Sequence, residues 1–282
     1  PTIYSSKFRV QLYTDVLPGL HAIDYGTMEF GDYNNDGLLD VLATGSGVSK
    51  VYKNAGNDTV LANPAVLPGL TYSAGIWLDF NNDNFLDFIM GGYNGTHNIM
   101  KLYLNNGDET FSETSHVFEG LKAPAIKSLD YNNDGYIDLI MSGADNAGHP
   151  QTILYKNCSG SAFQEIEAGI LDLMNGSIAC ADYNKDGYTD FIIQGDDSIT
   201  RYTRIYKNVD GSFNEVNSSI LNLNKGGLDW GDYDKDGDLD VVVSGLNAEP
   251  WVSGSSISFI DCSTLRIYRN DGNETFTQSV DW

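Results

Sequence analysis

The sequence contains few of the residue types that would identify several common classes of protein. Only three cysteines and four histidines occur among its 282 residues, and 16 basic residues stand against 39 acidic ones. Three cysteines do not make a disulfide framework, and no histidines have the spacing of a zinc site. A net charge of −23 argues against nucleic acids and anionic membranes as partners. No apolar run approaches the roughly 20 residues that a membrane span needs.

Catalytic motifs are missing as well. The sequence has no G-x-S-x-G nucleophile motif and no glycine loop of the kind that cradles phosphates. The four histidines are isolated from one another in the sequence. We therefore expect that the chain is not an enzyme.

What the sequence does contain is one acidic nonapeptide in five copies. The pattern is D-x-[DN]-x-D-[GN]-x-x-D, and the copies begin at Asp32, Asp79, Asp130, Asp182 and Asp232. Successive copies start 47, 51, 52 and 50 residues apart. A repeat of this period indicates a solenoid, a propeller or a similar array.

The residue types of each copy are those of a calcium site. Calcium takes 6–8 oxygen ligands, and carboxylates, amide carbonyls and backbone carbonyls all serve. Positions 1, 3, 5 and 9 offer side-chain oxygens, position 7 offers its backbone carbonyl, and position 6 makes a sharp turn for which glycine is suited. We predict about five calcium ions. The predicted ligands are Asp32, Asn34, Asp36, Leu38 and Asp40; Asp79, Asn81, Asp83, Phe85 and Asp87; Asp130, Asn132, Asp134, Tyr136 and Asp138; Asp182, Asn184, Asp186, Tyr188 and Asp190; and Asp232, Asp234, Asp236, Asp238 and Asp240.

The second copy has Asn84 where the other four have glycine. Asparagine tolerates the left-handed region of backbone conformation, so we expect the turn to persist. None of the loops is an EF-hand, because an EF-hand closes with Glu at position 12 between two helices. Here each closing Asp is followed by a short apolar run, such as Phe191-Ile192-Ile193, which suits a strand buried on both faces.

Each repeat reads as four strands. One strand precedes the acidic loop and a second follows it. A third carries a Tyr-x-Asn sequence, such as Tyr155-Lys156-Asn157, and after a turn a fourth opens with an aromatic residue in most copies, such as Phe163. Four antiparallel strands with an acidic loop between the first two are typical of a propeller blade.

These loops, each feeding an apolar strand that ends in glycine, resemble the FG-GAP or VCBS-type repeat of integrin α-subunit-like propellers. The resemblance spans about residues 21–282. It implies an all-β fold, bound calcium and an extracellular location. It does not carry over a ligand, because one propeller fold serves adhesion, sugar binding and enzymes.

We expect one propeller domain over residues 1–282, with repeats at about 21–70, 71–121, 122–173, 174–224 and 225–282. Residues 1–20 lack an acidic loop and resemble strands three and four of a blade, that is, an N-terminal half-blade. Three explanations are open: the sequence is a piece of a larger propeller, the half-blade completes the ring, or a neighbouring chain supplies the missing strands. We expect residues 3–13 to pair with a sheet edge, either near 276–280 of the same chain or in another subunit.

The acidic loops contain 17 of the 39 acidic residues, so much of the negative charge is predicted to bind ions. Cys180 is expected to be a packed thiol, whereas Cys158 and Cys262 are open to pairing with each other or between chains. Six N-glycosylation sequons occur, a number close to chance in a sequence rich in Asn, Ser and Thr. The candidate glycosylation sites are Asn57, Asn94, Asn157, Asn175, Asn217 and Asn273.

The remaining functional candidates are side chains that do not repeat. The connection between strands two and three of the last repeat is about eleven residues longer than its counterparts and contains Trp251. The matching connections of other repeats, which lie on the face opposite the acidic loops, contain Tyr93, His97, His149 and Tyr202. Exposed aromatic side chains can anchor a protein or stack on a sugar. We expect an extracellular, calcium-stabilised binding or adhesion module; the alternatives are a structural subunit of an extracellular assembly, self-associating through the half-blade, and a carbohydrate-binding lectin.

Overall fold

The computed structural model describes residues 20–253 and 256–281. Within them the chain is all-β, with twenty strands in five four-stranded antiparallel sheets and no helix. The sheets contain, in chain order, β1 (Thr27–Gly31), β2 (Asp40–Gly45), β3 (Val48–Asn54) and β4 (Val60–Ala62); β5 (Thr71–Leu78), β6 (Asp87–Tyr93), β7 (Asn98–Asn105) and β8 (Phe111–Glu113); β9 (Lys122–Leu129), β10 (Asp138–Ala144), β11 (Pro150–Asn157) and β12 (Phe163–Ile166); β13 (Met174–Ala181), β14 (Asp190–Asp196), β15 (Arg201–Val209) and β16 (Ser212–Val216); β17 (Leu228–Gly231), β18 (Asp240–Ser253), β19 (Ser256–Asn270) and β20 (Phe276–Asp281).

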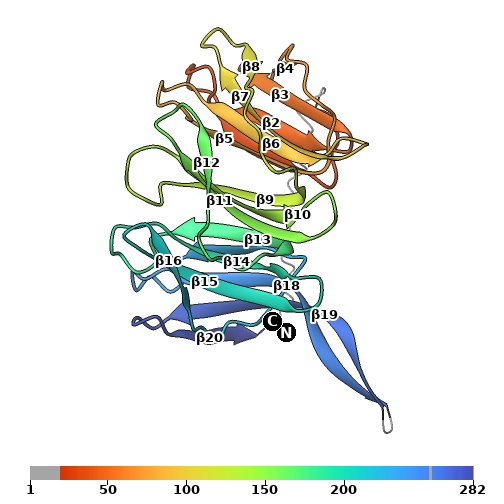
Figure 1. Ribbon diagram of the computed structural model, residues 1–282, viewed down its shortest axis with the longest axis vertical. Coiled ribbons are helices and arrows are strands. Elements are labelled where there is room, and N and C mark those ends of the chain that lie inside the picture. The colour runs from red at the N-terminus through yellow and green to blue at the C-terminus, as the bar shows by residue number, and fades with distance from the viewer. Residues whose placement is uncertain (1–19, 254–255, 282) are drawn as a thin grey trace, which may run out of the picture.

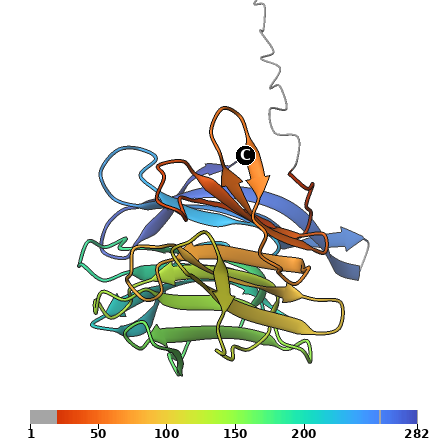
Figure 2. The same ribbon diagram turned by 90° about the horizontal axis from the view of Figure 1, so that it is seen from above.

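Each sheet is a simple meander in which consecutive strands are neighbours. The five sheets follow one another from the first, in orange, to the fifth, in blue (Figure 1). The series is curved, because the first and fifth sheets lie toward one side of the molecule and the third lies toward the other (Figure 2). The predicted propeller-like arrangement of four-stranded blades is therefore confirmed. Among the described residues, consecutive sheets are in extensive contact, whereas the first and fifth sheets are not.

The second strand of each blade is the apolar run predicted to be covered on both faces. Every residue of β2, β6 and β14 is buried, apart from Tyr93 at the end of β6. The hydrophobic core lies in layers between consecutive sheets. One such layer joins Ile89 and Leu102 of the second blade to Leu139 and Ile153 of the third. Because burial takes place between blades, each blade is stabilised by its neighbours.

The last blade differs from the prediction in one respect. The additional residues between its second and third strands do not form a loop. They extend β18 and β19 into a long hairpin that remains paired to Ser253 and Ser256 and projects from the sheets (Figure 1). The predicted half-blade of residues 1–20 lies outside the described residues except for Leu20, and its expected pairing lies wholly outside them.

Within the described part of the chain, no helix has the length and apolar character to cross a membrane. Cys158, Cys180 and Cys262 are all free thiols. The pairing considered for Cys158 and Cys262 is therefore not present within the chain.

Candidate metal centres and inter-blade clefts

All five acidic loops connect the first and second strands of a blade, so they lie on one face of the molecule. The third loop shows how such a loop is wound. The Asp130 carboxylate accepts hydrogen bonds from the N–H groups of Asp134 at 3.1 Å and Gly135 at 2.9 Å. The Asn132 side-chain oxygen also accepts from Asp134 N–H at 2.9 Å, and Asp134 accepts from Tyr136 N–H at 3.0 Å. The first, third and fifth positions thus hold the turn in shape.

The turn at position 6 requires a left-handed backbone. Gly135 has a φ of 81°, and Asn84, which replaces glycine in the second loop, has a φ of 68°. The expectation that asparagine preserves this turn is confirmed. Its loop makes the same hydrogen bonds from Asp83 N–H to Asp79 and from Asn84 N–H to Asp79, at 3.1 and 2.9 Å.

The ninth position is the most buried of the loop. Its five side chains are at most 1% exposed: Asp40, Asp87, Asp138, Asp190 and Asp240. Each of these residues begins the second strand of its blade. In most loops its carboxylate accepts two hydrogen bonds from backbone N–H groups. Asp138 takes one from Tyr131 N–H at 3.2 Å and one from Asn157 N–H at 2.7 Å. This carboxylate therefore ties the acidic loop to the third strand of the same blade.

Burial removes these carboxyl groups from the water that would otherwise stabilise their negative charge. Desolvation raises the pKa of Asp87 and Asp138 to about 6 and that of Asp190 to about 7, while the backbone hydrogen bonds act in the opposite direction. Asp190 Oδ2 is buried and has no hydrogen-bond partner among the described residues. A buried negative charge of this kind is stabilised by a cation at the same place.

The fifth loop has the highest density of carboxylates. Asp232, Asp234 and Asp240 each place an oxygen within 4.8 Å of the other two. In the other four loops, position 3 is an asparagine and offers an amide in place of the carboxylate. The amide nitrogens of Asn34, Asn132 and Asn184 are buried without a partner. The donor set of carboxylates, amides and backbone groups fits a hard cation such as calcium.

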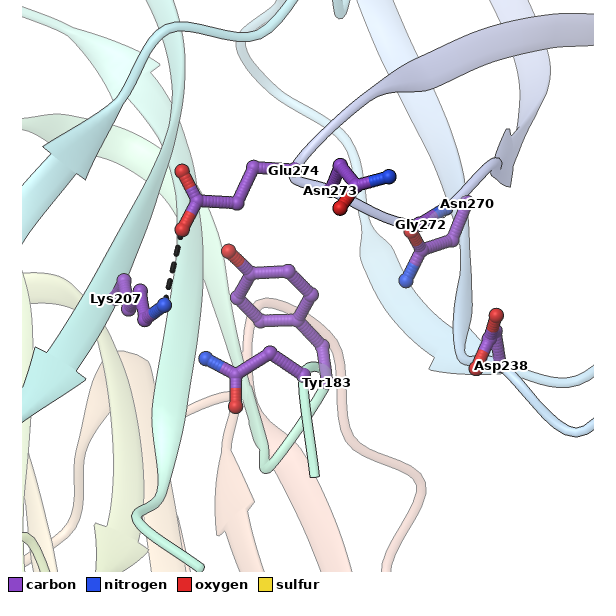
Figure 3. Close-up of a pocket in the computed structure, with 8 residues that line it drawn as sticks. Tyr183, Lys207, Asp238, Asn270, Gly272, Asn273 and Glu274 are labelled. Carbon is purple, nitrogen blue, oxygen red and sulfur yellow. Dashed lines mark hydrogen bonds and ion pairs between the residues drawn. The ribbon is translucent and has the colours of Figure 1, made fainter. Parts of the chain in front are cut away.

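Two clefts on this same face were not anticipated from the sequence. The larger, of about 430 Å³, lies between the fourth and fifth blades (Figure 3). Its floor and walls include Tyr183, Asn273 and the ion pair of Lys207 Nζ with Glu274 Oε1 at 3.0 Å. A cleft of about 300 Å³ occupies the equivalent place between the first two blades, lined by Tyr33 and Glu109. In both, the lysine of one blade pairs with the glutamate of the next.

The side chains predicted to bind a ligand on the opposite face are not gathered into one site. Tyr93 and His149 are exposed, and each bonds within its own loop: Tyr93 to Gly95 O at 2.8 Å, and His149 Nδ1 to Asp145 Oδ2 at 3.3 Å. Tyr202 donates to Asp197 Oδ2 at 3.1 Å. The Trp251 side chain lies outside the described part of the structure. Its backbone is paired with Ser258 in the projecting hairpin.

His97 is the member of that set that lines a cleft. Lys101, His116 and Asn146 line the same hollow, which has a volume of about 280 Å³. His116 has a structural role, because its Nε2 accepts a hydrogen bond from Phe163 N–H at 2.8 Å in the next blade. No repeated sequence motif predicts this cleft.

The candidate glycosylation sites differ in exposure. Asn57, Asn217 and Asn273 are exposed, whereas Asn94 and Asn175 are half-buried. Asn157 is fully buried and its amide nitrogen donates to Phe80 O at 2.8 Å and Ile137 O at 3.1 Å. The sequon prediction at Asn157 is therefore wrong for the folded chain, because a glycan has no room there.

The fold and the loops define an all-β repeat protein with propeller-like blades and one acidic loop in each. The model of the FG-GAP-like repeat matches four overlapping stretches, residues 32–90, 79–141, 130–193 and 182–243. The chain belongs to the FG-GAP-like repeat family. No curated protein matches it.

Among solved structures, the chain is similar to a lectin of Agrocybe aegerita. The structure of that lectin concerns its specific recognition of non-reducing terminal N-acetylglucosamine. The two are 19% identical, with a TM-score of 0.56 over 89% of this chain. The match covers 64% of the lectin chain. At this identity the likeness concerns the fold.

Proposed function

We propose that the chain is an extracellular, calcium-stabilised binding module and not an enzyme. The observation that carries the proposal is the fivefold recurrence of a buried carboxylate at the ninth position of an acidic loop. In each loop the residues that would hold calcium are the side chains at positions 1, 3, 5 and 9, together with the position-7 carbonyl. When bound, the ion supplies positive charge that offsets the mutual repulsion of these carboxylates.

Binding, and not catalysis, is supported by how the other polar groups are used. Tyr93 and His149 make hydrogen bonds within their own loops, and His116 bonds to the backbone of the next blade. The cleft between the fourth and fifth blades is lined by amides, a tyrosine and a lysine–glutamate pair. Such groups recognise polar ligands through hydrogen bonds.

Metal content tests the calcium part of the proposal. We expect the intact chain to hold about five calcium ions by elemental analysis, and Asp138→Asn to hold about one fewer. Glu167→Gln, an exposed acid outside the loops, is the matched control and should keep all of them. Retention of the full calcium content by Asp138→Asn, or a calcium-free wild type after dialysis against micromolar calcium, contradicts the proposal.

A carbohydrate is the ligand that we propose to test first, because polar side chains line a cleft on the acidic-loop face and a protein of similar fold is a lectin. The polar cleft between the fourth and fifth blades is the candidate site. A glycan array that includes glycans ending in N-acetylglucosamine tests this. If a glycan binds, Lys207→Ala should weaken binding, whereas Lys156→Ala should not. Lys156 has the same strand position in the third blade but pairs with Asp134 of its own loop. An array without hits from calcium-loaded protein excludes the lectin function and leaves the calcium proposal standing.

A further inference from the structure

The two ends of the blade series expose apolar side chains, most of whose counterparts in the other blades are buried or half-buried. At the fifth blade, Val242 is 37% exposed. Its counterparts at the same point of the second strand, Leu42, Ile89, Ile140 and Ile192, are at most 1% exposed. Tyr233 is 45% exposed, while its counterparts at position 2 of the other acidic loops are at most 6% exposed. We call the surface formed by Gly231, Tyr233, Val242 and Leu265 the trailing face.

The first blade has the matching exposure on its other side. Phe30 is 68% exposed and Leu39 is 58% exposed. Trp77 and Trp230 occupy the position of Phe30 in the second and fifth blades, and both pack against the preceding blade. Leu86, the counterpart of Leu39, packs there too. We call the surface formed by Phe30, Leu39, Asn54 and Asp58 the leading face.

The junction between the first two blades and that between the last two show what these faces are built to contact. Tyr33 stacks on Trp77 of the next blade, with ring centroids 5.9 Å apart, and Tyr183 stacks on Trp230 at 5.3 Å. The glycine before the first loop makes room for that ring, because a Cβ on Gly31 would lie 2.7 Å from Trp77 Cδ1. The fifth blade repeats this arrangement with Gly231 and Tyr233. Nothing among the described residues lies within 4 Å of a Cβ added at Gly231.

Polar groups at the two faces are matched in the same way. The third-strand asparagines of blades two to four each donate to the position-2 carbonyl of the preceding blade: Asn105 to Tyr33, Asn157 to Phe80, and Asn208 to Tyr131, at 2.7 to 2.8 Å. Asn54, in the first blade, donates to Leu39 O of its own blade and is only half-buried.

The charges at the two faces are complementary. Lys53 and Lys207 each pair with a glutamate in the third-to-fourth-strand turn of the next blade. Arg269 holds the position of these lysines in the fifth blade, and Asp58 holds the position of the glutamates in the first. Arg269 pairs with Asp271 of its own turn and keeps 48% of its side chain exposed. The trailing and leading faces therefore carry the two halves of the junction seen between the first two blades and between the last two.

From these features we propose that a second copy of this chain covers the exposed faces, the trailing face of one copy packing on the leading face of the next. Phe30 of one copy then lies over Gly231 and Tyr233 of its neighbour, Asn54 donates to the carbonyl of Tyr233, and Arg269 pairs with Asp58. Stacked repeats are stabilised by packing on their neighbours, and the apolar side chains of these two faces are exposed in the part of one copy that the structure describes. A head-to-tail contact of this type produces rings or filaments, according to whether the rotation closes.

Two face variants test this in the full chain with calcium present. Phe30→Asp disables the leading face and Tyr233→Asp disables the trailing face. By sedimentation we expect wild type to associate with increasing concentration. Each variant should weaken association by about thirtyfold or more, as for central interface residues. An equimolar mixture should form a two-chain species, because one intact face of each kind remains. Val117→Asp, at a site that is 90% exposed and on neither face, should behave as wild type.

Folding of the variants is checked by circular dichroism, which should match wild type because both side chains are exposed. A wild type that stays a monomer at every concentration overturns the proposal. Variants that associate as well as wild type also overturn it, since another surface then joins the copies. An exchange of the two charges is an independent test. Arg269→Glu should weaken association, and adding Asp58→Lys should restore it because the two faces again carry opposite charges.

Discussion

The side-chain amide of Asn157 donates to the carbonyl oxygen of Phe80, 2.8 Å away in the preceding blade. The same amide nitrogen donates to Ile137 O in its own acidic loop, and the backbone N–H of Asn157 bonds to Asp138 Oδ1. One buried residue thus links a third strand, an acidic loop and a neighbouring blade. Calcium bound at Asp138 would therefore stabilise the junction between the two blades as well as the acidic loop itself.

Replacing Asn157 with alanine should destabilise the protein. The change leaves two buried carbonyl groups without a donor, which costs on the order of 1–3 kcal/mol. Denaturant unfolding with calcium present should show a loss of about that size. Asn217→Ala, at an exposed asparagine, should change the free energy of unfolding by less than about 0.5 kcal/mol. Equal stabilities for the two variants would show that the hydrogen bonds donated by the Asn157 side chain contribute nothing to the free energy of unfolding.

Two glycines in equivalent positions should respond differently to alanine. A Cβ on Gly31 lies 2.7 Å from Trp77 Cδ1, so Gly31→Ala must displace a packed indole and should cost about 1–3 kcal/mol. A Cβ on Gly231 has no described neighbour within 4 Å. Gly231→Ala should therefore leave the stability of the monomer nearly unchanged, as measured by thermal melting at low protein concentration. A similar loss for both would mean that the trailing face is already covered within the chain.

The fold was largely predictable because its signals are local and repeated. The acidic nonapeptide, the apolar run after it and the Tyr-x-Asn sequence each occur five times at one period. Such repetition fixes the strand order of every blade. The structure confirms the five four-stranded sheets and the turn at Asn84.

What the sequence did not reveal depends on contacts between blades. The Tyr-x-Asn repeat was visible, but only the structure shows that its asparagine bonds to the preceding blade. The burial of Asn157 in a sequon and the cleft beside Lys207 arise from the same junctions. The long connection of the last blade was recognised by its length, yet length alone does not distinguish a loop from an extended hairpin.

Cys180 should be the least reactive of the three thiols. Burial raises the pKa of its thiol to about 12, although the residue as a whole is only half-buried. At pH 8 about one molecule in ten thousand then carries the reactive thiolate at this position. Alkylation of native protein, mapped by mass spectrometry, should label Cys158 and Cys262 well before Cys180. Unfolding should abolish the difference, and rapid labelling of Cys180 in native protein would contradict the packing described for β13.

The stability of the calcium-free protein should increase as the pH falls from 8 to 5. Burial raises the pKa of Asp87 and Asp138 to about 6 and of Asp190 to about 7 in the folded chain, above the value of about 3.9 for an unfolded aspartate. The folded state therefore binds protons more tightly, and the stability gained by protonation is lost as the pH rises through 6 to 7. After treatment with EDTA, the melting temperature at pH 5 should exceed that at pH 8 by at least about 5 °C.

Calcium should reverse this dependence, because protons and calcium compete for the same carboxylates. With millimolar calcium, the melting temperature should be higher at pH 8 than at pH 5. Asp190→Asn removes one of the titrating groups, so it should reduce the pH dependence of the calcium-free protein while weakening the stabilisation by calcium. A calcium-free protein that becomes less stable toward pH 5 would show that these carboxylates are not desolvated in the absence of the ion.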